Sequence, residues 1–310
     1  MPYFPIPPEQ RAIRQQADRG IEAIRVLFLE AVARARGNLN LAYLEQIVAS
    51  AATSGGIIDL AALRIPVRID TLVGSLTADL APLLEQVVFR GTQVGAPIFA
   101  ETMGFRLPPD LAVFRQGAQG AARSIVGELV RGIEHGWTDP ISGVHRPGSL
   151  ETIQRIIAEG YELGHTPARI ASNISQVVGL TDRQSDELLR FWAKLEADDT
   201  LTQRERLALL ERERKRKLGI RGRAIGRTET TRAASAAQDL IWQQAVDDGE
   251  LDAEVYEQEW LPAPGNCPIC EGLRGKRAPI GGEFPAPGGK GPPNPHPHCR
   301  CGRRLRRKRR

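Results

Sequence analysis

The chain has 310 residues and is basic, with 42 Lys and Arg against 37 Asp and Glu and a formal net charge of +5. Its hydrophobic content of 41% is enough for a sizeable core, although only 5% of the residues are aromatic. No apolar run approaches 18 residues, and the opening Met-Pro-Tyr-Phe-Pro-Ile-Pro-Pro lacks the basic and apolar regions of a signal peptide. We therefore expect no membrane span and a protein that stays in the cytoplasm where it is made.

Residues 1–148 are expected to form a helical region that docks a partner. Apolar residues recur at three- and four-residue steps, which predicts amphipathic helices. The predicted helices cover residues 9–36, 41–52, 66–103 and 110–135. Pro82 and Pro97 interrupt the third of these, so we expect a kink or two helices there. Its long apolar stripe favours a bundle core, with a partner surface as the alternative.

Residues 149–250 carry well-marked helix starts, after a loop over 136–148 where we place a domain boundary. Ser149 and Thr166 are expected to cap helices, and Thr181-Asp-Arg-Gln184 and Thr202-Gln-Arg-Glu205 have the spacing of capping boxes. A basic helical stretch follows, with eleven Lys and Arg against four Glu between residues 203 and 232. The helix is expected to continue to Asp248, and residues 255–261 are expected to form a strand.

All four cysteines, and two of the five histidines, lie in the short stretch from Cys267 to Cys301. The stretch opens with Cys267-Pro-Ile-Cys270 and closes with His296-Pro-His298-Cys299-Arg-Cys301. Two thiolates separated by two residues can turn around one ion, and a second cluster can then complete a tetrahedron. The alternatives are four reduced thiols or two disulfides, which the absence of a secretion signal disfavours.

The spacing predicts a structural Zn²⁺ site in a module over residues 251–302. Cys267 and Cys270 form one half; the other half comes from His296, His298, Cys299 and Cys301, of which we favour Cys299 and Cys301, with His296 as the alternate ligand. No carboxylate or water-activating base stands at a motif-like spacing beside these residues, so we expect a closed site. The ion would supply much of the folding free energy of a segment so rich in Gly and Pro.

Two basic segments are candidates for contact with double-stranded DNA, because the rest of the chain is net acidic. The helical candidates are Arg212, Arg214, Lys215, Arg216 and Lys217, and the candidates in a tail over 303–310 are Arg303, Arg304, Arg306, Arg307, Lys308, Arg309 and Arg310. The tail is expected to be too repulsive to fold alone, and each base could contact a phosphate. The alternatives are a solvated helix face and an inert solubilising tail.

At its motifs the chain resembles the head morphogenesis proteins of tailed phages, also called minor head proteins. The resemblance is carried by Cys267-Pro-Ile-Cys270, Gly272-Leu-Arg-Gly-Lys276, Pro292-Pro293, the His296-to-Cys301 run, Glu162-Leu-Gly-His-Thr-Pro-Ala-Arg-Ile-Ala171, Gly179-Leu-Thr181 and Arg223-Ala-Ile-Gly-Arg-Thr-Glu-Thr230. It covers about half of the chain, from roughly residue 150 onward. Arg274 stands where the family usually has an acidic residue, and the loop before His296 is longer than usual.

The resemblance implies a non-enzymatic virion protein that sits in the head near the portal and is made in the host cytoplasm. Its implied partners are the portal or the major capsid protein, and packaged DNA. The fold class we predict is mainly α: a helical N-terminal region and a helical C-terminal half that ends in a small zinc-knuckle-like module with little β structure.

Two alternatives involve catalysis. Asn294, His296 and His298 suggest a metal-dependent nuclease of the His-Asn-His type, although such chemistry needs a further His downstream and none follows. Arg227, Thr228 and Glu229 belong to a family-like motif. We interpret them as a buried ion pair or cap that positions the metal module, with catalysis as the alternative.

Overall fold

Helices dominate the computed structural model, as the sequence predicts, and the structure describes residues 6–52, 68–138, 143–286, 289–291, 296 and 299–308. The helices are α1 (Pro8–Asp18), α2 (Ile21–Gly37), α3 (Leu41–Ala52), α5 (Ile69–Met103), α6 (Leu111–His135), α7 (Ser149–Glu162), α8 (Pro167–Val177), α9 (Asp182–Glu196), α10 (Gln203–Asp247) and α11 (Pro268–Gly272). The strands are β1 (Trp137–Thr138), β2 (His145–Arg146), β3 (Tyr256–Leu261), β4 (Arg277–Ala278), β5 (Phe284–Ala286), β6 (Gly289–Gly291) and β7 (Gly302–Arg307).

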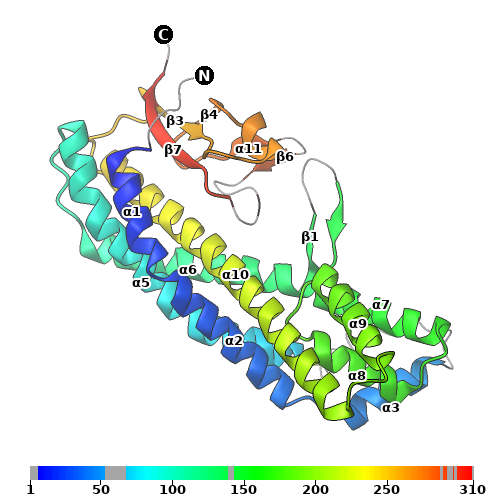
Figure 1. The fold of residues 1–310 in the computed structure, drawn as a ribbon. Helices are drawn as coiled ribbons and strands as arrows, with labels where there is room; N and C mark the ends of the chain where they lie inside the picture. The colour runs from blue at the N-terminus through cyan, green and yellow to red at the C-terminus, as the bar shows by residue number, and fades with distance from the viewer. Residues whose placement is uncertain are drawn as a thin grey trace.

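Helices α1, α2, α5 and α10 run along an elongated bundle, with α6 packed on α5 and α10 (Figure 1). Helices α3, α7, α8 and α9 gather at one end of the bundle, and the sheet of β3, β4 and β7 lies at the other. One hydrophobic core extends from Ile13 in α1 to Leu251 after α10. The boundary predicted at residue 148 therefore falls within one core and does not separate two.

The first predicted helix, over residues 9–36, is two helices that meet at Gly20. Gly20 lies so close to α5 that a Cβ placed on it would be 3.1 Å from Val87 Cγ2. Its N–H donates to Ala17 O at 2.8 Å, which tightens the end of α1. The break thus lets α1 and α2 both follow the surface of α5.

Helix α5 is continuous for 35 residues, with Pro82 and Pro97 inside it. The sequence predicted either a kink or two helices at these prolines, and the prediction of two helices is wrong. Packing against α1, α2, α6 and α10 buries Leu72, Leu76 and Leu80 fully, which can offset the backbone hydrogen bonds that the prolines lose.

By length and composition alone, α5 could also cross a membrane, with a mean hydropathy of 1.3 over its 18-residue window. A core helix passes the same test. The absence of a membrane span therefore stays a prediction.

Most of the predicted helix starts are confirmed. The Asp110 side chain accepts from the backbone N–H groups of Ala112 and Val113, and Thr166 accepts from that of Arg169. Both capping boxes, at Thr181 and at Thr202, have both of their hydrogen bonds. Ser149 is an exception, because Gly148 occupies the N-cap position of α7 and Ser149 is the first helical residue.

The C-terminal sheet corrects the prediction of a separate basic tail. Strand β7 pairs antiparallel with β3 from Tyr256↔Arg307 to Leu261↔Gly302, and β4 pairs with the other edge of β3. Positions 303–307 therefore belong to an ordered strand, because β3 supplies acidic side chains that offset the repulsion between arginines. Arg309 and Arg310 lie outside the described residues.

Helices α10 and α2 are in backbone contact at Gly226. A Cβ on Gly226 would lie 2.6 Å from Ile21 O, whereas a Cβ on Gly219, on the same helix, would meet nothing within 4 Å. We expect Gly226→Ala to lower the free energy of unfolding by about 1–3 kcal/mol through overpacking. Gly219→Ala is expected to raise it by about 0.5–1 kcal/mol through helix propensity. Urea unfolding of both variants checks this, and equal midpoints would contradict the close contact.

Candidate metal centre

The cysteines and one histidine of the terminal module converge on one small volume. Nε2 of His296 lies 3.2 Å from Cys267 Sγ and 3.0 Å from Cys270 Sγ, and Cys270 Sγ lies 3.7 Å from Cys299 Sγ. Two groups of ligand atoms result, Cys267–Cys270–His296 and Cys270–Cys299–Cys301, with every atom of a group within 4.8 Å of the others. We call these five residues the sulfur–imidazole cluster; Cys270 belongs to both groups.

This geometry fits a metal ion. Thiolates about 2.3 Å from a tetrahedral ion lie about 3.8 Å from one another, which is close to the Cys270–Cys299 separation. The four cysteines are free and not joined as disulfides. The cluster can therefore hold a metal ion, and the alternative of two disulfides is wrong.

The protonation of the buried thiols indicates the need for a cation. Hydrogen bonds with Cys299 and Cys301, together with burial, raise the pKa of the Cys270 thiol. Hydrogen bonds from Cys270 and Cys299 in turn hold the pKa of the Cys301 thiol at about 3. Three buried sulfurs at these distances cannot all be thiolates without a compensating positive charge. A metal ion in the cluster would supply that charge.

The structure brings together all four predicted cysteines and also His296, which the spacing predicted only as the alternate ligand. His296 contacts Cys267 and Cys270 from the far half of the motif. His298 and Asn294, which the nuclease alternative needs, lie outside the described residues. With five candidate ligands for the four positions of a tetrahedral ion, the described cluster leaves no evident position for a hydrolytic water.

Local sequence explains how the cluster is presented. Cys267 is the N-cap residue of α11, and Pro268 at the first helical position turns the chain so that Cys270 follows within one turn. Cys301 directly precedes β7, and its Sγ accepts from Ala263 N–H at 3.3 Å. A second small core of Trp260, Phe284, Leu273 and Ala278 surrounds Cys270, Cys299 and Cys301. The two aromatic rings meet edge to face at 5.2 Å.

The module docks on the bundle through arginines. Arg14 of α1 donates to the carbonyl of Arg300 at 2.8 Å and to that of Cys301. Arg303 of β7 is 1% exposed and donates to Asp239 at 2.5 Å and to Gln258 at 2.9 Å. Its guanidinium also lies over the Trp242 ring at 5.4 Å. One end of the cluster, at Cys301, is therefore fixed to both α1 and α10.

Several predicted DNA-binding residues are engaged inside the protein. Arg214 and Lys217 are about 5% exposed and pair with Glu211 and Glu187, at 3.1 and 2.6 Å. On β7, Arg303 pairs with Asp239 as described above. Arg304 and Arg306 both pair with Glu259 of β3, at 2.8 and 2.7 Å. These side chains stabilise the fold. The partners of Lys217 and of the β7 arginines lie far away in the chain, so the sequence did not reveal those pairs, whereas Glu211 is only three residues from Arg214.

The motif residue Glu229 forms a buried ion pair, but with Arg232 and not with Arg227. Glu229 is 2% exposed and lies 3.2 Å from Arg232, which also contacts Glu128 of α6 at 3.3 Å. Burial raises the pKa of Glu229 to about 7, against the opposing effect of Arg232. Arg227 is exposed. The Arg232 guanidinium therefore joins Glu229 of α10 to Glu128 of α6.

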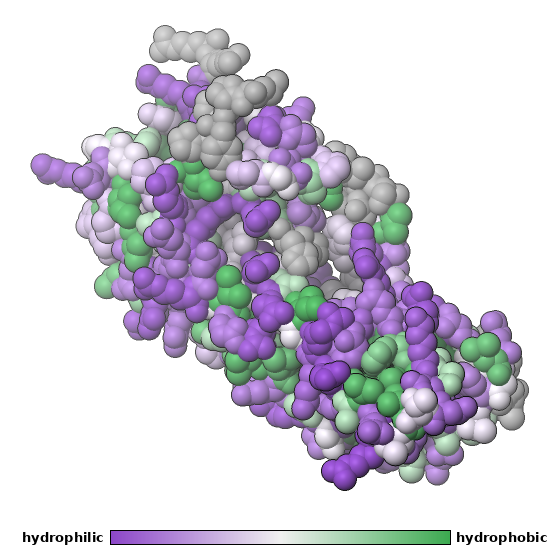
Figure 2. All heavy atoms as spheres, in the orientation of Figure 1, coloured by the Kyte–Doolittle hydropathy of each residue, from purple (hydrophilic) through white to green (hydrophobic). Residues whose placement is uncertain are grey.

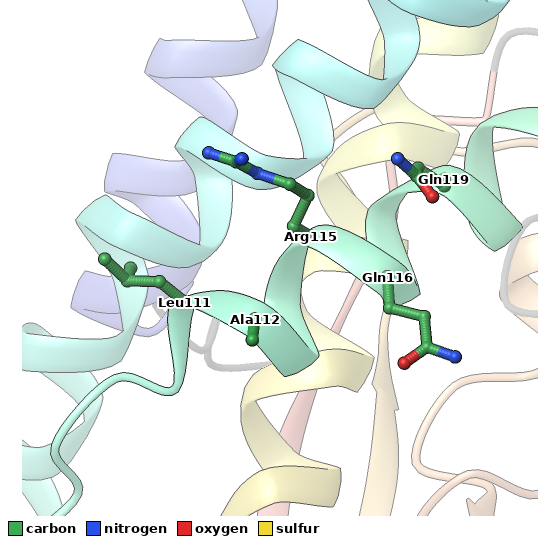
Figure 3. Close-up of a pocket in the computed structure, with 5 residues that line it drawn as sticks. All are labelled: Leu111, Ala112, Arg115, Gln116 and Gln119. Atoms are coloured by element: carbon green, nitrogen blue, oxygen red, sulfur yellow. The ribbon is translucent and has the colours of Figure 1, made fainter.

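Two hollows of the described surface lie away from the cluster. Figure 3 shows one of about 440 Å³, lined by Leu111, Ala112, Arg115, Gln116 and Gln119. All five come from α6 and their side chains diverge. Another, of about 500 Å³, lies between α7, α8 and α9, where the ion pairs Arg155–Asp186 and Arg169–Glu196 occupy its charged groups. Neither presents a convergent catalytic set.

Comparison of the chain with protein-family models, with curated proteins and with solved structures finds no match. The family resemblance of the C-terminal motifs therefore stays a prediction.

Removal of the shared ligand tests the metal centre. Because Cys270 belongs to both groups of ligand atoms, we expect Cys270→Ser to reduce bound metal to near zero. Ser50→Cys, on the far helix α3, adds a thiol outside the cluster and should leave metal content unchanged. Elemental analysis of the dialysed proteins measures this. Equal metal content in Cys270→Ser and the unaltered chain would contradict the assignment.

The buried Glu229 predicts a pH dependence of stability. Its pKa is near 7 in the folded state and 4.5 ordinarily, so between these values the folded protein binds more protons than the unfolded chain. Stability is therefore expected to fall as pH rises from about 4.5 to about 7. Glu229→Gln should flatten this dependence, as measured by urea unfolding across that range.

The matched control for Glu229 is Glu187→Gln. Lys217 and Arg183 hold the pKa of Glu187 at about 2, so its titration is complete well below pH 5. Loss of the Glu187 charge should lower the free energy of unfolding by about the same amount at every pH between 5 and 7, so the slope of that free energy against pH should not change. A Glu229→Gln curve parallel to that of the unaltered chain would exclude a titrating Glu229.

Proposed function

We propose that this chain is a structural protein of a tailed-phage head, a minor head protein that acts near the portal during assembly. The single observation that supports this best is the convergence of the signature residues. Cys267, Cys270, Cys299 and Cys301, with His296, belong to the C-terminal motif that carries part of the resemblance, and they meet in one cluster. Residues that matched by chance would have no reason to meet in space.

The ion of this site is proposed to be Zn²⁺, held by four of the five cluster residues. Thiolates and imidazole are soft and borderline ligands, and a tetrahedral set of them suits zinc better than the hard cations Mg²⁺ or Ca²⁺. When bound, zinc would neutralise the thiolates and crosslink α11 to the segment before β7. The chain's own residues then do the rest: Arg14 and Arg303 fix the crosslinked module to α1 and α10.

The proposed role involves no catalysis. His296 faces Cys267 and Cys270, so its ring nitrogen Nε2 is committed to the cluster and is not free to activate water. The buried carboxylate of Glu229 is paired with Arg232. The elongated helical bundle would serve as the surface that contacts the portal or the major shell protein, first in the host cytoplasm and then in the virion.

Quantitative mass spectrometry of purified particles tests the role. We expect the chain in the head fraction at a few copies per particle. The Cys270→Ser variant, expressed in place of the unaltered chain, should be depleted from particles because its terminal module is loosened. Absence of the unaltered chain from particles would contradict the proposal. Cleavage of plasmid DNA by the purified chain with Mg²⁺ or Mn²⁺ would favour the nuclease alternative.

A further inference from the structure

Helix α10 carries a line of exposed arginines along one face. Arg212, Arg216, Arg223 and Arg227, with Ile220 between them, follow one another at steps of four and three residues, so their side chains share one side of the helix. All five are exposed. At 1.5 Å per residue the line from Arg212 to Arg227 is about 22 Å long. We call these four arginines the α10 ridge.

Acidic side chains near the ridge pair mostly with arginines and lysines outside it. Glu211 pairs with Arg36 and Arg214, and Glu213 pairs with Arg216 and Lys217, the second of which is buried. Arg216 is thus the one ridge residue with an acidic partner within 4.0 Å in the described part of the chain. No ion pair joins Arg212, Arg223 or Arg227 to another described side chain.

The helices that flank the ridge do not neutralise it. On α2, Glu22 is the acid close enough for Arg223 to lower its pKa, but its first partner is Arg25 of its own helix. On α9, Glu187 is shared by Lys217 and Arg183. The bundle face that presents α10 in Figure 1 is predominantly hydrophilic in Figure 2. Three of the four ridge arginines, Arg212, Arg223 and Arg227, therefore present positive charge without an ion-pair partner among the described residues.

We propose that the α10 ridge binds the phosphate backbone of duplex DNA. Guanidinium groups match phosphate oxygens in a bidentate manner, and a straight row of them over about 22 Å can follow several phosphates. An acidic protein partner would be expected to meet apolar surface as well, and the ridge offers only Ile220, at 43% exposure. DNA is therefore the polyanion that the ridge fits best.

The binding is independent of base sequence. Helix α10 packs against α2, α5, α6 and α9, so only its outer face is available and the helix cannot enter the major groove as a recognition helix does. Contacts from such a face reach phosphates and not base edges. This assignment replaces the predicted contacts of Arg214, Lys217 and Arg303, which are buried, and adds Arg223 and Arg227.

The salt dependence of DNA binding by the purified full chain tests the ridge. The triple variant Arg212→Gln, Arg223→Gln, Arg227→Gln is compared with the unaltered chain in filter binding to a duplex of arbitrary sequence. Each lost phosphate contact should reduce the slope of log K against log salt by about 0.9, so a reduction of about 2.7 is expected. These side chains make no described ion pair, so urea unfolding should show the variant as stable as the unaltered chain.

A matched control separates the ridge from net charge. Arg106→Gln, Arg123→Gln, Arg131→Gln removes the same charge from exposed positions on and just before α6, and it should leave the slope unchanged. Equal slopes for the ridge variant and the unaltered chain would overturn the proposal, as would equal losses in both triple variants. Absence of DNA binding by the unaltered chain would overturn it too, and so would competition by polyglutamate as strong as by DNA.

This test is distinct from that of the virion role. A chain that enters particles but does not bind DNA would refute the ridge alone. A chain that binds DNA through the ridge but is absent from particles would refute the virion role alone.

Discussion

The crowding of buried sulfurs at the C-terminal end of the bundle is the constraint on which this structure depends. Cys270, Cys299 and Cys301 are each at most 3% exposed and lie within 4.8 Å of one another, next to an imidazole. Thiols so placed can ionise together only around a cation, and an ion there would crosslink two segments about 30 residues apart. The small aromatic core around Trp260 packs against these sulfurs, and β7 begins directly after Cys301.

Two arginines fix the terminal module to the bundle. Arg14 contacts the backbone carbonyls of Arg300 and Cys301, and Arg303 is buried between Asp239 and Trp242. A buried guanidinium is costly unless it is paired with an acid and hydrogen-bonded, so these contacts specify one position of the module on α1 and α10. Elsewhere on α10, the exposed Arg212, Arg223 and Arg227 have no ion-pair partner among the described residues and are available to bind a polyanion. The same helix thus separates arginines that stabilise the fold from arginines that can meet a polyanion.

Local signals in the sequence predicted much of this architecture, and contacts between distant segments account for what it missed. The Asp110, Thr166, Thr181 and Thr202 caps and strand β3 were predictable, because each depends on residues a few positions apart. The convergence of the cysteines was predictable from ligand spacing. The pairing of β7 with β3, the burial of Lys217 and the place of His296 were not, because each depends on a partner that only the fold brings near. The arginines at 303–307 were predicted to form a tail because the sequence alone does not show that the acidic strand β3 lies beside them.

Hydrogen exchange before and after removal of the metal with a chelator is the most direct test of this account. If the cluster holds an ion that fixes the module to the bundle, removal should deprotect β3, β7 and α1, while α5 and α6 stay protected. Unchanged protection of β7 and α1 after complete metal removal, or a protein isolated without metal that is already protected there, would contradict it.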